Sequence, residues 1–228
     1  MSTPVMICDD DPIVREALAA YIDREPSLHV AGTVETAEDC LQTIDRVNPD
    51  VVLMDLALPG IDGIEATRAI RTRRPSTTVL VLTTFSTDEQ VKAAIGAGAA
   101  GFLLKSTTAA ALVAAVRAAA VGAGTVITPE LAAHLAIAAM SPTEAEDAAP
   151  SPEEAADALG LTDREAEVLE LLCAAESNAG IAKALTLSES TVKSHVSSLM
   201  TKLGCTSRLQ IAVRAFERGL VRPPRPSA

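Results

Sequence analysis

The sequence predicts an α/β domain with a five-stranded parallel, doubly wound sheet, followed by a smaller all-α domain. In the first 121 residues, short apolar runs alternate five times with stretches of helical periodicity, as in parallel strands joined by helices. Right-handed crossovers would place those helices on both faces of the sheet. The charge also changes along the chain: the first 158 residues carry 10 Lys and Arg against 23 Asp and Glu, and the remainder carries 9 against 7. This asymmetry indicates two domains with different partners.

The expected strands of the first domain are short apolar runs with many β-branched residues, which suit strands buried on both faces. They span residues 5–8, 28–31, 51–54, 79–82 and 101–104. The segments 37–47, 64–74, 88–97 and 109–121 carry apolar side chains at helical spacing. One more helix is expected to open at Pro12, because proline is favoured in the first turn of a helix.

Four of these strands are followed at once by polar side chains that can take part in chemistry. Asp9 and Asp10 follow the first strand, Asp55 the third, Thr83 the fourth and Lys105 the fifth. The carboxyl ends of parallel strands meet at one edge of a sheet, so we expect these side chains to converge. Taken singly, the acidic pair could cap a helix and Lys105 could be a solvated charge; their shared placement favours a site.

The residue types at this edge predict phosphoryl chemistry. Three carboxylates repel one another unless a cation neutralises them, and oxygen ligands with room for water suit Mg²⁺. Asp55 could then act as a nucleophile and form an acyl phosphate. Thr83 could hydrogen-bond one phosphoryl oxygen, and the Lys105 ammonium could pair with another.

Asp9-Asp10, Asp55, Thr83 and Lys105 resemble the acidic pair, phosphoacceptor, switch hydroxyl and lysine of response-regulator receiver domains. The resemblance covers roughly residues 1–122 and implies a flavodoxin-like sheet. It also implies that Asp10 binds Mg²⁺ directly and that Asp9 acts largely through water.

Three other positions matter for the resemblance. The backbone carbonyl of Ala57 would supply a further Mg²⁺ ligand, and Phe102 would be the switch aromatic that turns inward on activation. Asp11 makes the acidic stretch a triple, and Ala57 is small where a bulkier polar residue is common in such domains. Both departures could alter the lifetime of the phosphoryl group.

The composition after the first domain indicates a linker. A short helix is expected at 129–140, and the stretch Ser141 to Ala158 contains three prolines and six acids but no basic residue. Such a stretch is expected to be extended and flexible, because like charges repel and few apolar groups can be buried. The predicted parts are a first domain at 1–122, a linker at 123–158, a second domain at 159–221 and a mobile tail at 222–228.

The second domain carries signals for four helices. Thr162 and Glu165 form a capping box, and further capping serines precede the next three helices. The third of these helices, which Gly204 ends, has an apolar stripe. Its opposite face carries side chains able to hydrogen-bond: Thr191, Lys193, Ser194, Ser197, Ser198 and Thr201. Two short helices joined by a tight turn, the second with a polar outer face, are typical of helix-turn-helix DNA binding.

The segments Leu161 to Leu169 and Ser190 to Ser197 resemble the LuxR-type four-helix DNA-binding domain. A receiver domain joined to this domain is the architecture of the NarL/FixJ family of two-component response regulators. The resemblance implies that double-stranded promoter DNA is a partner and that the fourth helix mediates a homodimer. The implied DNA contacts are base edges for Lys193, Ser194 and Ser197, and phosphates for Ser190 and Thr191.

Two positions of the second domain depart from that pattern by lacking a positive charge. Ala179 stands where the family often has lysine, and Ser197 where some relatives have a basic residue. DNA affinity should therefore depend more on dimerisation and less on salt concentration.

The predicted protein is a cytoplasmic transcription regulator and not an enzyme. It would accept a phosphoryl group on Asp55 from a sensor histidine kinase, with Mg²⁺ as cofactor, and bind DNA as a phosphorylation-favoured dimer. No apolar run approaches the ~20 residues of a membrane span. The four well-separated cysteines indicate reduced thiols, not a zinc site or a disulfide framework.

Two alternatives belong to other classes of protein. One is a Mg²⁺-dependent phosphatase with an aspartyl-phosphate intermediate, which is disfavoured because Ala57 stands where such enzymes usually carry a second acid. The other is a DNA-binding regulator controlled without phosphorylation, whose first domain serves as a dimerisation module. Acyl phosphate formation and Mg²⁺ affinity would separate it from the main prediction.

Overall fold

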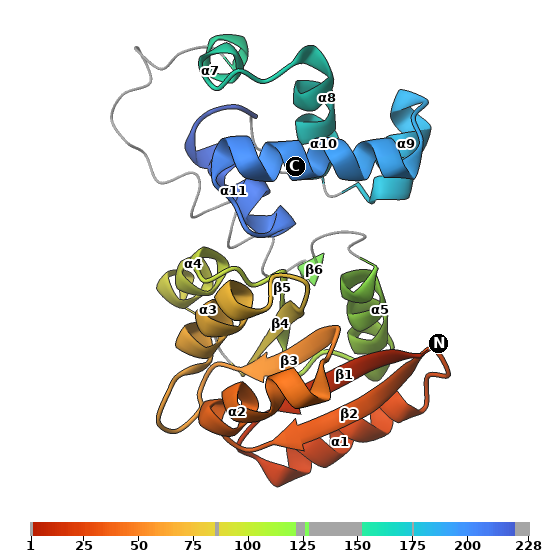
Figure 1. Ribbon diagram of the computed structural model, residues 1–228, viewed down its shortest axis with the longest axis vertical. Coiled ribbons are helices and arrows are strands. Elements are labelled where there is room, and N and C mark those ends of the chain that lie inside the picture. The colour runs from red at the N-terminus through yellow and green to blue at the C-terminus, as the bar shows by residue number, and fades with distance from the viewer. Residues whose placement is uncertain (1, 85–86, 122–125, 128–151, 175, 222–228) are drawn as a thin grey trace, which may run out of the picture. The chain divides into compact units, whose positions relative to one another are not determined.

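The computed structural model describes residues 2–84, 87–121, 126–127, 152–174 and 176–221. These residues belong to two compact units, one within residues 1–128 and one within residues 129–228 (Figure 1). The short helix expected at 129–140 and the tail at 222–228 lie outside the described residues.

The first unit alternates strands and helices as the sequence predicts. The strands are β1 (Thr3–Cys8), β2 (Leu28–Val34), β3 (Val51–Asp55), β4 (Thr78–Thr83), β5 (Gly101–Leu104) and β6 (Val126–Ile127). The helices are α1 (Pro12–Asp23), α2 (Ala37–Val47), α3 (Gly63–Arg73), α4 (Asp88–Gly96) and α5 (Ala109–Ala120). The strands are all parallel, in the order β2-β1-β3-β4-β5-β6. The predicted five-stranded doubly wound sheet is confirmed, and the two-residue β6, too short to leave a sequence pattern, extends it beside β5.

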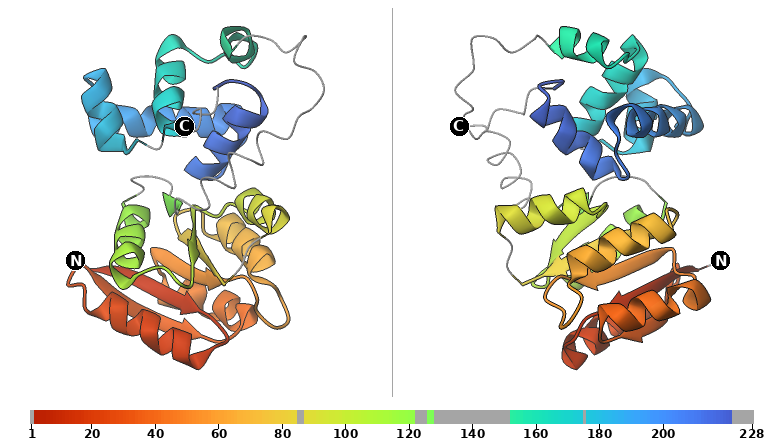
Figure 2. Two further views of the ribbon diagram at one scale, coloured as in Figure 1. Left: turned by 180° about the vertical axis from the view of Figure 1, so that it is seen from behind. Right: turned by 60° about the vertical axis from the view of Figure 1, so that its left-hand side comes forward.

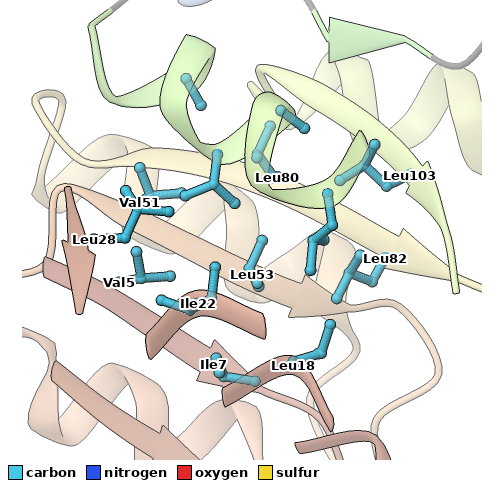
Figure 3. Packing of buried hydrophobic residues seen from close by; sticks show 14 residues of the cluster. Val5, Ile7, Leu18, Ile22, Leu28, Val51, Leu53, Leu80, Leu82 and Leu103 are labelled. Atoms are coloured by element: carbon cyan, nitrogen blue, oxygen red, sulfur yellow. The ribbon is translucent and has the colours of Figure 1, made fainter. Parts of the chain in front are cut away.

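Alternating residues of the buried strands build a separate core on each face of the sheet. On one face, Val5, Leu53 and Leu80 point toward α1 and α5, as Figure 3 shows. On the other face, Met6 and Met54 pack against α2 and α3. Figure 2 shows the layer of strands between these two sets of helices. Because both faces are covered, polar chemistry is confined to the strand ends.

Helices α1 and α3 each begin directly after an aspartate that caps the helix N-terminus. Asp11 is the N-cap of α1 and accepts the Ile13 amide at 2.8 Å, with Pro12 at the first helical position. The third member of the acidic triple is therefore used locally to start the helix. Asp62 caps α3 in the same way and accepts the Glu65 amide at 2.7 Å. Both helices thus start beside the carboxyl edge of the sheet.

The second unit is all-helical among its described residues. Its helices are α7 (Pro152–Ala158), α8 (Asp163–Cys173), α9 (Asn178–Leu185), α10 (Glu189–Leu203) and α11 (Arg208–Glu217). Thr162 and Glu165 form the predicted capping box, and Ser177, Ser188 and Ser207 cap α9, α10 and α11. Gly204 follows α10 in the left-handed conformation, as a helix-ending glycine does.

Part of the predicted extended linker is helical instead. Residues 152–158 form α7, and Ala155, Ala156 and Leu159 pack against the core of the second unit. Gly160, with φ of 63°, closes the helix, and the Leu161 amide donates back to the Ala156 carbonyl at 3.0 Å. The average acidity of the stretch concealed these apolar residues, which supply a packing face.

All four cysteines are free, which agrees with the expected reduced thiols. Among the helices that the structure describes, none is both long and apolar enough to cross a membrane.

Candidate functional site

The carboxyl edge of the first unit's sheet brings the predicted chemical residues to one place. Asp9 directly follows β1, Asp55 ends β3, Thr83 ends β4 and Lys105 directly follows β5. The register pairs Met54 with Val81 and Val81 with Phe102, so these strands end together. The convergence expected from the order of strands and polar residues is present in the fold.

Lys105 lies between two buried carboxylates. Its Nζ is 2.8 Å from Oδ2 of Asp9 and 3.0 Å from Oδ2 of Asp55. The side chains of Asp9 and Asp55 are 0% and 3% exposed, and that of Lys105 is 17% exposed. The Lys105 amide also donates to the Thr83 carbonyl at 2.8 Å, which ties the end of β5 to the end of β4. A single ammonium group therefore pairs with two buried carboxylates.

At this edge of the sheet, the positive charge of Lys105 does not fully compensate the negative charge of the buried carboxylates. Burial raises the pKa of Asp9 above its ordinary value, although hydrogen bonds from Lys105 and from the Asp11 amide oppose the rise. Burial would lower the pKa of Lys105, but its hydrogen bonds to Asp9 and Asp55 outweigh burial and raise it. The Lys105 ammonium therefore stays charged, whereas ionisation of Asp9 still costs free energy because its carboxylate is buried.

The acidic group fits a hard divalent cation. Asp9, Asp10 and Asp55 form a group whose carboxylate oxygens all lie within 4.8 Å of one another. Asp9 and Asp55 are buried, whereas Asp10 is exposed, so water can complete a coordination shell. An all-oxygen donor set beside a buried carboxylate with a raised pKa suits Mg²⁺, which would relieve the charge cost.

The loop after Asp55 is held by a glycine and a glutamate. A Cβ on Gly63 would lie 2.0 Å from the Asp55 carbonyl oxygen, so only glycine allows α3 to start this close to β3. Glu38 of α2 accepts the Ile61 amide at 3.1 Å and thereby holds the same loop from the other side. Ala57 is exposed within this loop.

The two predicted switch residues are buried on neighbouring strands, Thr83 at the end of β4 and Phe102 within β5. Phe102 on β5 is 1% exposed and is among the largest fully buried side chains, and Thr83 is 5% exposed. Phe102 therefore occupies the inward position in this structure.

In the second unit, the predicted DNA contacts lie on the exposed face of α10. Ser190, Thr191, Lys193, Ser194 and Ser197 are all exposed. The hydroxyls of Ser194 and Ser197 donate back to backbone carbonyls four residues earlier, at 3.1 and 3.0 Å. These hydroxyls can rotate toward another acceptor without any movement of the helix.

Ser198 does not belong to that polar face, contrary to the sequence prediction. Its hydroxyl donates to Oε1 of Glu165 at 2.5 Å and is partly buried against α8. Glu165, which is 5% exposed, also accepts the Thr162 amide at 2.8 Å and the Lys202 ammonium at 2.7 Å. Lys202 donates in addition to the Gly160 carbonyl at 2.5 Å.

This cluster, which we call the Glu165 cluster (Thr162, Glu165, Ser198, Lys202 and the Gly160 carbonyl), joins α10 to α8 and to the end of α7. Burial alone would raise the pKa of Glu165, but its hydrogen bonds from Lys202, Ser198 and Thr162 lower it to about 2. The sequence pattern predicts only the capping box of this cluster, Thr162 and Glu165. The spacing of Ser198 and Lys202, four residues apart on one helix face, was the available signal.

The sequence pattern does not single out Arg15 of α1, whose guanidinium contacts the backbone of the acidic loop, which we define as Asp9 to Asp11. Its position, four residues after Asp11 and therefore one helical turn later, places it over that loop.

Comparisons with known proteins cover both units. Residues 5–117 match the response regulator receiver domain family, and residues 159–215 match the LuxR family of bacterial regulatory proteins. The chain is 36% identical to the transcriptional regulatory protein YxjL of Bacillus subtilis over 95% of this chain and 96% of that protein. It is also 36% identical to the DNA-binding transcriptional activator DevR/DosR of Mycobacterium tuberculosis over 96% of this chain and 97% of that one.

A solved structure shows the same two-part organisation. The response regulator ChrA of a heme-sensing two-component system is 33% identical, with a TM-score of 0.52, over 96% of this chain and 98% of that one. Both the sequence and the fold are therefore similar to those of transcriptional response regulators along nearly the whole chain.

Proposed function

The chain belongs to the NarL/FixJ family of two-component response regulators, and we propose that it is a transcription factor switched by phosphorylation of Asp55. A sensor histidine kinase would donate the phosphoryl group, and the phosphorylated form would favour a homodimer on double-stranded promoter DNA. The proposed place of action is the cytoplasm, where that DNA lies.

The observation that carries this proposal is the position of Lys105 between Asp9 and Asp55, at 2.8 and 3.0 Å, beside the exposed Asp10. A buried carboxylate that is meant only to stabilise a fold gains by being fully compensated. Here two buried carboxylates share one ammonium and stand next to a third. This shortage of positive charge favours a site that takes up a cation.

In the proposed reaction, an oxygen of Asp55 attacks the phosphorus of a phosphohistidine. A bond from that oxygen to phosphorus forms as the phosphorus–nitrogen bond breaks, and the imidazole leaves with its electron pair. Bound Mg²⁺, held by Asp9, Asp10, Asp55 and the Ala57 carbonyl, would supply positive charge against the phosphoryl oxygens. Lys105 would pair with one phosphoryl oxygen and the Thr83 hydroxyl would donate to another.

Activation would follow from the same contacts. Recruitment of Thr83 to the phosphoryl group would select a conformation in which Thr83 and Phe102 hold the active positions. A preference of a few kcal/mol for the dimerising conformation changes its population by orders of magnitude. The DNA-reading helix would be α10, with Lys193, Ser194 and Ser197 toward base edges and Ser190 and Thr191 toward phosphates.

The test is the mass and oligomeric state of the full chain in Mg²⁺, with and without acetyl phosphate. We expect one phosphoryl adduct on the wild type and none on Asp55→Asn. Asp50→Asn, which changes an exposed carboxylate just before β3, is the matched control and should be modified normally. An adduct that persists in Asp55→Asn would overturn the proposal. A wild type without any adduct would favour a regulator that works without phosphorylation.

A further inference from the structure

Arg15 of α1 makes a set of contacts that centres on the acidic loop. Its Nη1 donates to the backbone carbonyl of Asp9 at 2.6 Å and to that of Asp10 at 3.0 Å. Its Nη2 donates to Oε1 of Glu35 at 2.9 Å. The Arg15 side chain is 13% exposed, whereas that of Glu35 is 69% exposed. The Arg15 side chain is therefore mostly buried, and its guanidinium contacts the loop through the loop's backbone carbonyls.

These contacts hold the backbone from which the side chain of Asp10 projects. Asp9 is already fixed on other sides, because its amide donates to the Val34 carbonyl at 3.2 Å and its Oδ1 accepts the Asp11 amide at 3.0 Å. Asp10 is exposed, and among the described residues the Arg15 guanidinium is the side chain that contacts its carbonyl. Glu35, directly after β2 and next to the cap Thr36 of α2, holds the other end of the guanidinium.

We propose that Arg15 is a positioning residue of the cation site. It holds the backbone of Asp9 and Asp10 so that their carboxylates converge with Asp55 before Mg²⁺ binds. Glu35 supports it by orienting the guanidinium. This inference rests on the proposed function, because it assigns Arg15 a role in the same site.

A fork-shaped donor is needed for this geometry. The planar guanidinium reaches two carbonyls with one nitrogen and a carboxylate with the other, which a single ammonium cannot reproduce. Residues that orient metal ligands typically change metal affinity by 10–100-fold when they are removed. Pre-ordering the loop has an effect of the same kind, since fewer conformations are lost on binding.

The sign of the effect separates positioning from simple electrostatics. By charge alone, Arg15 repels a cation, so Arg15→Gln should tighten Mg²⁺ binding, and Glu35→Gln should weaken it. If Arg15 positions the loop, both substitutions weaken binding. The two accounts thus make opposite predictions for one variant.

The experiment is calorimetric titration of Mg²⁺ into the metal-free full chain. We expect Arg15→Gln to weaken Mg²⁺ binding roughly tenfold, Arg15→Lys to weaken it by a smaller factor, and Glu35→Gln by about two- to threefold. Arg117→Gln is the matched control: it removes a 60% exposed arginine whose partner Glu25 is 4.0 Å away, and its affinity should equal that of the wild type.

Hydrogen exchange of the metal-free proteins supplies a second readout. The amides of Asp10 and Asp11 should exchange faster in Arg15→Gln than in the wild type, while the β1 amides stay protected. Unchanged or tighter Mg²⁺ binding in Arg15→Gln, with unchanged exchange, overturns the positioning role. If that variant does not fold, wild-type affinity in both Arg15→Lys and Glu35→Gln overturns it. A wild type that binds no Mg²⁺ removes the proposed function together with this inference.

Discussion

Asp9 in the first unit and Glu165 in the second are both buried carboxylates paired with a lysine. The ammonium lies 2.8 Å from Asp9 and 2.7 Å from Glu165, and the two residues are 0% and 5% exposed. Yet the pKa of Asp9 is raised, whereas that of Glu165 is lowered to about 2. The same pairing of a carboxylate with a lysine thus leaves the ionised carboxylate unfavourable in the first unit and favourable in the second.

The number of donors to each carboxylate explains the difference. Glu165 receives a backbone amide, two hydroxyls and an ammonium that interacts with no other carboxylate among the described residues. Asp9 receives the Asp11 amide, but it shares its ammonium with Asp55 and has the carboxylate of Asp10 nearby. The carboxylate of Glu165 is thus compensated within the protein, whereas that of Asp9, in the proposed cation site, is left short of positive charge.

The largest expected effect is on the Glu165 cluster. Glu165→Gln should destabilise the second unit by about 3 kcal/mol. The substitution removes the anionic acceptor that Lys202, Ser198 and Thr162 share. Urea unfolding, with hydrogen exchange localised to α8 and α10, measures the loss. Glu167→Gln is the control on the same helix: Glu167 is exposed, so the change should be within about 0.5 kcal/mol. Equal losses in the two variants would contradict the comparison.

The acid limb of stability should carry the signature of the same residue. The folded pKa of Glu165 is about 2, below its ordinary value of 4.5, so its ionised form stabilises the fold above pH 4.5. That contribution, at most about 3 kcal/mol, is lost as the pH falls toward and through 2. Other carboxylates contribute equally to the wild type and to Glu165→Gln. The difference between the unfolding free energies of these two proteins therefore isolates the contribution of Glu165. A difference independent of pH between 6 and 2 would show that Glu165 is not the titrating group.

Lys202→Met should have a smaller effect, of about 1–2 kcal/mol, since Glu165 keeps the donors from Ser198 and Thr162. The pKa of Glu165, followed by NMR, should rise because the Lys202 ammonium, the donor that lowers this pKa most, is gone. Lys193→Met changes an exposed lysine on the same helix and should leave both quantities unaltered. No rise in the pKa of Glu165 would mean that Lys202 is not its main partner.

The two carboxylates also differ in how visible they are in the sequence. Asp9 could be placed in a site because each strand end carries its own polar residue, and parallel strands end at a common edge. The capping role of Glu165 was predictable for the same local reason. Its contacts with Ser198 and Lys202 span 33 and 37 residues, so they depend on how α8 and α10 pack.

Two other features escaped prediction for physical reasons of the same type. Helix α7 depends on the packing of Ala155, Ala156 and Leu159 against helices far along the chain, which the acidic composition of its segment does not reveal. Arg15 is one arginine on an amphipathic helix until the fold brings Glu35 beside it. Local periodicity and strand order predict the elements and the site; contacts between distant segments need the packed structure.

The smallest expected effect lies at Asp9 and gives the comparison its sharpest test. Since the folded pKa of Asp9 is raised above its ordinary value, its charge destabilises the metal-free fold at neutral pH, and the cost disappears as the pH falls through the raised pKa. Asp9→Asn should therefore leave the stability of the metal-free first unit unchanged or higher by up to about 1 kcal/mol. If the proposed cation site is present, Mg²⁺ raises the thermal stability of the wild type, and Asp9→Asn should abolish that increase, because a ligand stabilises only the state that binds it. The measurement is thermal unfolding with EDTA and with Mg²⁺. Asp39→Asn, an exposed change on α2, is the control and should keep the full response to Mg²⁺.

The contradicting outcome would be a loss of stability in EDTA for Asp9→Asn as large as that for Glu165→Gln. Both carboxylates would then be structural, and the shortage of positive charge at the sheet edge would no longer indicate a cation site.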